Sequence, residues 1–139
     1  MQFWDASALV SLVVAEDDSE RLRRLARQGD LVTWCLSTVE ICSAIERRSR
    51  EGVMRAADRQ NALGTLKELS ESWTEITAMA VVRDRACRLL AVHSLRSADA
   101  LQLAAALIAA GDRPTDHYFI CADGRLREAA SREGFKLDA

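Results

Sequence analysis

Four acidic residues that lie far apart in the sequence each stand where an apolar run meets the start of a helical pattern: Asp5, Glu40, Asp99 and Asp123. In a parallel α/β sheet such junctions gather at one edge, at the carboxyl ends of the strands. Four carboxylates held close together repel one another unless a positive charge lies between them. A hard divalent cation, which prefers oxygen ligands, suits that position. The spacing therefore predicts a divalent-metal site at one edge of a sheet.

Each acid also has a purely structural explanation. Asp5 and Asp123 are suited to capping the helix that follows them, and Glu40 completes a Ser-x-x-Glu capping box with Ser37. Asp99 falls in the first turn of its predicted helix, where the helix dipole favours a negative charge by about 0.3–1 kcal/mol. The shared type of junction and the small residues around each acid favour a common site. They leave the structural explanation open for any single residue.

Strand-like runs alternate with helical patterns along the chain. Strands are predicted at 2–4, 31–36, 73–77, 117–121 and 135–137. Helices are predicted at 6–15, 20–28, 37–51, 62–73, 82–93, 97–110 and 124–133, with Ser97 as an N-cap. The alternation predicts parallel strands joined by right-handed crossovers, an α/β fold. The 139 residues contain no linker or repeat, so one domain over 1–139 is expected.

The composition is that of a folded domain with a nearly neutral charge. Hydrophobic residues make up 49% of the chain and the net charge is -2, which argues against disorder. That balance neither requires nor excludes a nucleic-acid partner. Most of the 19 basic residues are arginines, which grip phosphates bidentately. For any single arginine cluster, a solvated helix face remains the simpler interpretation.

The sequence predicts a cytoplasmic location. The amino end carries no basic segment followed by an apolar one, as a secretory signal would. The longest apolar stretch, around 103–110, is far shorter than the ~20 residues that span a bilayer. The cysteines form no Cys-x-x-Cys pair, and free thiols in apolar segments fit a reducing cytosol: Cys35, Cys42, Cys87 and Cys121.

Other residue types offer weaker chemistry. His93 completes an apolar helix face and His117 opens a strand, so both are more typical of packed histidines than of ligands. No serine lies in a Gly-x-Ser-x-Gly turn, no cysteine has a matching histidine pattern, and no glycine-rich phosphate loop is present. Covalent catalysis through a serine or cysteine is therefore unsupported.

Four segments, taken in order, resemble the motifs of PIN-domain proteins. They read WDASALV at 4–10, STVE at 37–40, LRSADALQLA at 95–104 and CADGRLREAA at 121–130. The block around Asp99 is the most specific of the four, and the order and spacing cover the whole chain. Two positions depart from the family pattern: Gln102 stands where histidine is common, and Ala122 where a hydroxyl residue is common.

The resemblance implies a three-layer α/β/α sandwich around a parallel sheet of about four or five strands, and an endoribonuclease that depends on Mg²⁺ or Mn²⁺. The length suits the VapC-type toxins of toxin–antitoxin pairs, which implies a homodimer and a VapB-like antitoxin. The predicted groove for the antitoxin is the helix pair over 37–73. The four acids would hold one or two ions, and Ser7 would contact a metal-bound water or a phosphate. Weaker candidates for RNA binding are three arginines: Arg47, Arg48 and Arg96.

Two other interpretations remain open at this point. One is a PIN nuclease with a housekeeping role in RNA processing, which has no antitoxin neighbour. The other is a catalytically silent binding module that uses the fold to hold a partner. The RNA that is cleaved, the number of metal ions and the oligomer size are not encoded in any recognisable motif.

Overall fold

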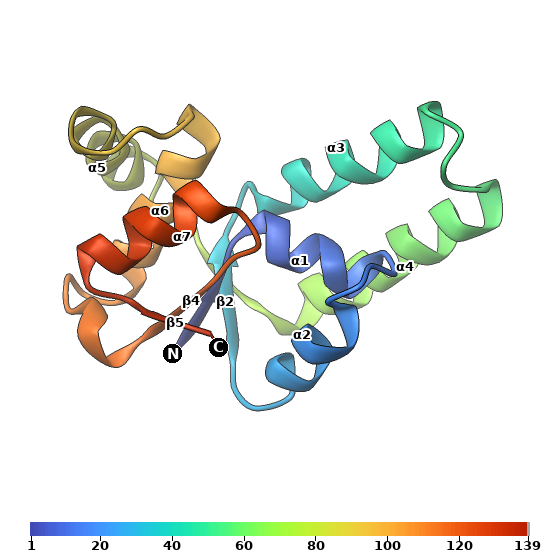
Figure 1. The fold of residues 1–139 in the computed structure, drawn as a ribbon, viewed down its shortest axis with the longest axis horizontal. Helices are drawn as coiled ribbons and strands as arrows, with labels where there is room; N and C mark the ends of the chain where they lie inside the picture. Colours follow the sequence, from blue (N-terminus) through green and yellow to red (C-terminus); the bar gives the residue numbers. More distant parts are fainter. Residues whose placement is uncertain (139) are drawn as a thin grey trace.

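The central element of the molecule is a five-stranded sheet in which all strands are parallel, in the order β3-β2-β1-β4-β5 (Figure 1). A computed structural model describes residues 1–138. The strands are β1 (Gln2–Trp4), β2 (Leu31–Trp34), β3 (Thr74–Ile76), β4 (Tyr118–Ile120) and β5 (Lys136–Leu137). The predicted parallel α/β fold is confirmed, and most of the strands are a residue or two shorter than the patterns suggested.

Helices cover both faces of this sheet, which gives the three-layer α/β/α sandwich. They are α1 (Ala6–Val13), α2 (Ser19–Ala26), α3 (Ser37–Arg50), α4 (Ala56–Ser72), α5 (Met79–Val92), α6 (Ser97–Ala109) and α7 (Gly124–Glu133), with a short 3₁₀ helix at Pro114–Asp116. One buried cluster joins the sheet to α5, α6 and α7. A second cluster joins the opposite face to α1, α2, α3 and α4.

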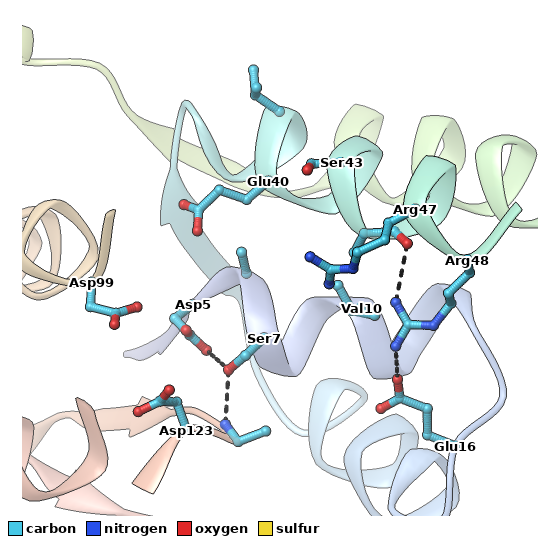
Figure 2. A pocket seen from close by; sticks show the side chains of 14 residues that line it. Asp5, Ser7, Val10, Glu16, Glu40, Ser43, Arg47, Arg48, Asp99 and Asp123 are labelled. Atoms are coloured by element: carbon cyan, nitrogen blue, oxygen red, sulfur yellow. Dashed lines mark hydrogen bonds and ion pairs between the residues drawn. The ribbon is translucent and has the colours of Figure 1, made fainter. Parts of the chain in front are cut away.

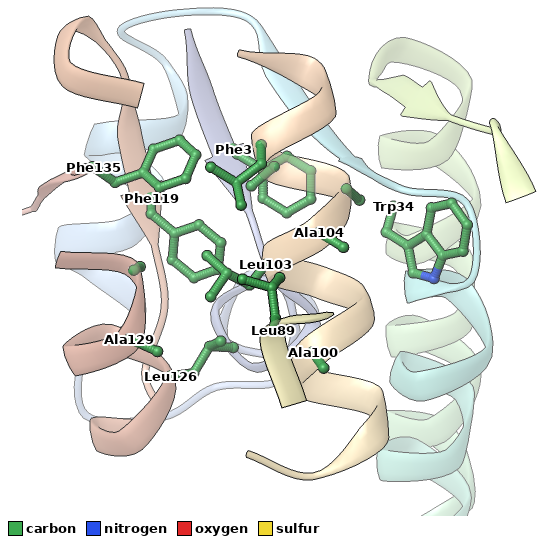
Figure 3. Close-up of a cluster of buried hydrophobic side chains, with 14 of the residues drawn as sticks. Phe3, Trp34, Leu89, Ala100, Leu103, Ala104, Phe119, Leu126, Ala129 and Phe135 are labelled. Atoms are coloured by element: carbon green, nitrogen blue, oxygen red, sulfur yellow. The ribbon is translucent and has the colours of Figure 1, made fainter. Parts of the chain in front are cut away.

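The central strand β1 is buried on both sides because successive side chains of a strand point to opposite faces. Phe3 stacks on Phe119 with ring centroids 5.7 Å apart, and Phe135 packs against Phe119 at 5.6 Å (Figure 3). Trp4 lies in the cluster on the other face of the sheet. Both Phe3 and Trp4 are fully buried. The strand that leads to Asp5 is therefore fixed from both faces.

The helix that carries Asp99 packs closely against the sheet because its buried side chains are small. Ala100, Ala104, Ala105 and Ala106 are fully buried. Their small volume lets α6 lie against β2 while it packs along α5. This packing carries the first turn of α6, with Asp99, to the edge where β2 ends.

The strand order reverses beside β1. From β1 the chain moves outward to β2 and β3, then returns to β4 on the other side of β1. Ligands of open α/β sheets bind in the crevice at the carboxyl ends of the two strands where the order reverses. Asp5 follows β1 directly and Asp123 follows β4 by three residues. Both therefore lie at the crevice that this topology creates.

Two predicted helix caps are wrong. The N-caps of α3 and α6 are Leu36 and Arg96, and neither makes a side-chain capping bond. The backbone N–H of Glu40 donates to the carbonyl of Leu36, so α3 begins earlier than a capping box with Ser37 requires. Ser97 likewise lies inside its helix. The capping box fails because its serine hydroxyl is buried and bonded elsewhere in the core.

The cysteines differ in exposure more than their apolar surroundings suggested. All four are free; Cys121 is buried, whereas Cys87 is exposed. Within residues 1–138, no helix combines the length and the apolar character needed to cross a membrane.

Candidate functional site

All four predicted acids line one open pocket of about 640 Å³ (Figure 2). Asp5 comes from the junction of β1 and α1, and Asp123 from the junction of β4 and α7. Glu40 lies in the first turn of α3 and Asp99 in the first turn of α6. Asp99 thus reaches the pocket from a helix that follows another helix, not from a strand end. Four segments far apart in the chain meet at this pocket.

Asp5 is the most buried of the four, with 3% of its surface exposed. One carboxylate oxygen accepts hydrogen bonds from the Ser7 hydroxyl at 2.7 Å and from the Ala8 N–H at 3.2 Å, so Asp5 caps α1. Burial raises the pKa of Asp5 to about 7, although these hydrogen bonds lower it and the charge of Glu40 raises it further. Asp5 therefore both caps α1 and contributes a carboxylate to the pocket.

The pKa values of two further acids in the pocket are also raised. Burial raises the pKa of Glu40, a hydrogen bond from Gln102 lowers it, and the charge of Asp99 raises it. Burial raises the pKa of Asp99 too, with the charge of Asp123 adding to the rise and Arg96 opposing it. The negative charges of this pocket are therefore only partly compensated by the protein. A bound cation is the usual way to offset such charge.

Asp123 lies at the exposed side of the pocket and caps α7 through the N–H of Leu126 at 3.0 Å. Its own backbone N–H donates to the Cys121 sulfur at 3.2 Å. The sulfur also lies 3.7 Å from the Ser7 hydroxyl. Cys121 therefore helps to fix the backbone that presents Asp123, a role that the sequence did not suggest.

Ser7 joins the two junctions at the centre of the site. Its hydroxyl donates to Asp5 and accepts from the backbone N–H of Ala122 at 3.0 Å (Figure 2). The hydroxyl proton is thus directed at Asp5. Ser7 lines the pocket, where it connects the start of α1 to the loop after β4. Its predicted contact with a metal-bound water or a phosphate stays a prediction.

The arginines flank the acids on two sides. Arg47 and Arg48 line the pocket along α3; Arg48 is engaged by Glu16 at 2.6 Å, while Arg47 forms no ion pair within residues 1–138. On the other side, Arg96 and Arg125 line a second hollow of about 630 Å³, which shares Asp99 and Asp123 with the first. That hollow extends the pocket past α6 and α7.

Two residues of this site were not among the predicted site residues, although Gln102 was noted as a departure from the family pattern. Arg125 follows the motif acid by two positions, but its place beside Arg96 depends on how α6 and α7 pack. Gln102 donates to Glu40 at 2.8 Å from the buried face of α6. A polar residue inside a helix of alanines and leucines was the available signal for Gln102.

The two histidines lie apart from the acids. His93 is buried, and its Nε2 lies 2.6 Å from Glu133 of α7. The Nδ1 of His117 lies 3.2 Å from the amino group of Met1. Neither histidine lines the acid pocket or the adjoining hollow.

The donor set of the pocket fits a hard divalent cation. Its four acids offer only carboxylate oxygens, which suit Mg²⁺ and Mn²⁺. In the part of the chain that the structure describes, no three His, Cys, Asp or Glu side chains stand close enough to hold an ion directly. Magnesium commonly uses one or two carboxylates and keeps several waters. The residues therefore fit an ion held partly through water.

Comparison with known proteins assigns the family. The chain matches the model of the PIN domain over residues 3–131, which is nearly its whole length. It therefore belongs to the PIN domain family, and its fold is that of nucleases that act on nucleic acid. A search of curated proteins gave no match.

The raised pKa of Asp5 predicts a pH-dependent gain in stability for the Asp5→Asn variant without metal. A carboxyl whose pKa rises from 3.8 to about 7 on folding contributes its stability below pH ~4 and loses it as the pH rises through 7. Asparagine cannot ionise, yet it can still cap α1. We expect Asp5→Asn to raise the free energy of unfolding at pH 8, by at most on the order of 4 kcal/mol, and much less at pH 5.

Urea unfolding of the metal-free protein at both pH values measures this difference. Asp84→Asn, at an exposed position of α5, is the matched control and should show no such pH dependence. An equal effect of Asp5→Asn at pH 5 and pH 8 would contradict the role of burial.

Proposed function

We propose that this protein is a Mg²⁺- or Mn²⁺-dependent endoribonuclease and the toxin of a VapBC-type toxin–antitoxin pair. The observation that carries the nuclease proposal is the meeting of four carboxylates from four segments at one pocket of a PIN domain. Support for the toxin role comes from the motif resemblance. We further propose a cytoplasmic location and a homodimer.

In this proposal the four acids hold the cation, directly or through water. When bound, the ion supplies a water of lowered pKa and positive charge beside the scissile phosphodiester. Ser7 and Ala8 keep the Asp5 carboxylate oriented toward the pocket. A pocket carboxylate that the ion leaves free would accept the proton of the attacking water. The expected products carry a 5′-phosphate and a 3′-hydroxyl.

The arginines would direct the RNA backbone across the acids. Arg47 stands on one side of the pocket and Arg96 and Arg125 on the other. Each can hold a phosphate through charge-assisted hydrogen bonds. A strand bound on both sides would present the phosphodiester between them to the carboxylates. Arg48 contributes less, because Glu16 already engages it.

The antitoxin would bind along the helix pair α3–α4, which extends away from the sheet (Figure 1). Beside this pair lies a hollow of about 590 Å³ whose lining includes the apolar residues Val13, Val53 and Met54. An amphipathic segment of the antitoxin suits such a surface. An arginine from the same segment could enter the acid pocket and offset its charge in place of the metal.

Cleavage of RNA by the purified protein tests the nuclease activity. We expect cleavage with Mg²⁺ or Mn²⁺, none after dialysis against EDTA, and recovery when Mn²⁺ is restored. Asp99→Asn nearly keeps the shape of the side chain but removes one negative charge from the pocket. It should lower the rate by about 100-fold or more, because even the loss of an outer partner of a metal ligand typically costs about 10–100-fold. The assay follows a labelled RNA and maps the 5′ ends of the products.

Asp84→Asn is again the control, because it removes an equal charge from an exposed face remote from the pocket. Cleavage that persists in excess EDTA would reject the metal mechanism. A fully active Asp99→Asn protein would reject the role given to Asp99.

The salt dependence of RNA binding tests the arginines. The logarithm of affinity for a single strand falls with the logarithm of salt by about 0.7 for each phosphate neutralised. Arg96→Gln and Arg125→Gln should each reduce that slope by about this amount and raise the KM more than they lower kcat. Arg83→Gln, whose guanidinium pairs with Asp84 on α5, is the control. An unchanged slope in both variants would remove the second hollow from the RNA path.

Expression in a bacterial host tests the toxin role. We expect the wild-type protein to arrest growth and Asp99→Asn to relieve the arrest. Co-expression of the product of a small adjoining reading frame should restore growth, and that product should co-purify with the protein. Metal-dependent cleavage without growth arrest would instead indicate a housekeeping nuclease. A folded protein that cleaves no RNA with either metal would indicate a binding module.

A further inference from the structure

Gln102 is a fully buried amide within an otherwise apolar stretch of α6. Burying an amide without hydrogen bonds is costly, so a residue in this place needs partners. Its Nε2 supplies them by donating to the Ser37 hydroxyl at 2.9 Å and to Oε2 of Glu40 at 2.8 Å. Both acceptors lie in the first turn of α3. Gln102 therefore connects α6 to α3 at the edge of the sheet where the acid pocket opens.

A chain of hydrogen bonds runs from the Trp4 carbonyl through the hydroxyls of Thr33 and Ser37 to Gln102, and the donor of each bond can be assigned. The Thr33 hydroxyl donates to the Trp4 carbonyl at 2.6 Å, because a carbonyl can only accept. Ser37 must then donate to Thr33 at 2.7 Å and is left as an acceptor for Gln102. The amide nitrogen must therefore face Ser37 and Glu40. The opposite orientation would place the amide oxygen against a carboxylate and a hydroxyl with no proton to give.

This orientation leaves the amide oxygen unsatisfied. Oε1 of Gln102 is buried and has no hydrogen-bond partner within residues 1–138. An unsatisfied buried acceptor costs about 1–3 kcal/mol. An apolar side chain of similar size would avoid that cost. Packing alone therefore does not account for an amide at this position. The two hydrogen bonds that it donates, to Ser37 and Glu40, do account for it.

The chain of bonds also fixes Glu40 relative to Asp5. It begins at the carbonyl of Trp4, the residue directly before Asp5, and ends at the carboxylate of Glu40. The members between them are buried: Thr33, Ser37 and Gln102 are each fully buried. A rigid connection of this kind holds two carboxylates of the pocket, from different segments, in one arrangement.

We propose that Gln102 is a positioning residue that holds the Glu40 carboxylate in the orientation from which it helps to bind a divalent cation. The proposal rests on the proposed function for the identity of the ligand. Gln102 lies outside the pocket lining and acts through Glu40. Partners of this kind typically change metal affinity by 10–100-fold when they are removed.

Calorimetric titration of the full chain with Mn²⁺ tests the proposal. Gln102→Met keeps the length of the side chain but cannot donate, and should weaken Mn²⁺ binding by about 10–100-fold. Its thermal stability should stay close to that of the wild type, because the unsatisfied acceptor is lost together with the two bonds. Gln102→His retains an N–H donor and should recover most of the affinity. Gln60→Met, on the exposed side of α4, is the matched control and should change neither property.

Wild-type Mn²⁺ affinity in a folded Gln102→Met protein overturns the positioning role. A large loss of stability with unchanged affinity overturns it too, because it shows a packing role only. If Gln102→Met does not fold, Ser37→Ala decides. That variant removes the acceptor that orients the amide, so it should weaken Mn²⁺ binding, and unchanged affinity overturns the proposal.

The same titration separates this proposal from the proposed function. A wild-type protein that binds Mn²⁺ without cleaving RNA overturns the nuclease activity and leaves the positioning role standing. A wild-type protein that does not bind Mn²⁺ overturns both.

Discussion

The burial of carboxylates that also repel one another in one pocket is the constraint on which the rest of the structure depends. Asp5, Glu40 and Asp99 all have raised pKa values, with burial as the main cause. Such an arrangement persists only where the surrounding backbone is held firmly. Here β1 is packed on both faces, and α6 is fixed against the sheet through its buried alanines. The stability of the hydrophobic layers thus offsets the electrostatic cost of the site.

The same residues serve the fold and the site, so the two explanations of the acids do not compete. Asp5 and Asp123 satisfy helix N–H groups as caps and also line the pocket. A cap needs a short acidic or hydroxyl side chain directly before a helix. Where that helix follows a strand of a parallel sheet, the same position lies at the edge where a ligand crevice forms. Capping bonds hold the carboxylates in place before any ligand arrives.

The sequence predicted those parts of the molecule that depend on local pattern. The strand before Asp5 was predicted from a short apolar run, and the helix after Asp123 from apolar residues at helical spacing. That Asp5 and Asp123 lie close together follows from the rule that the carboxyl ends of parallel strands share one edge of the sheet. The capping box of Ser37 was wrong because tertiary contacts gave its hydroxyl other partners. The contacts of Gln102 and Arg125 were not predicted for the same reason, since they depend on how α6 packs beside α3 and α7. Such contacts leave no periodic signal in a single sequence.

A gradient of burial across the pocket explains how the acids coexist without a cation. Asp5 lies at the buried end with a pKa of about 7, so near neutral pH it is partly protonated and the pocket carries less negative charge. Asp123 lies at the exposed end, where solvent screens its charge. In the proposed function, binding of a divalent ion displaces the remaining proton of Asp5, since metal binding to carboxylates releases protons. The proton on Asp5 thus offsets part of the negative charge that a bound cation would otherwise offset.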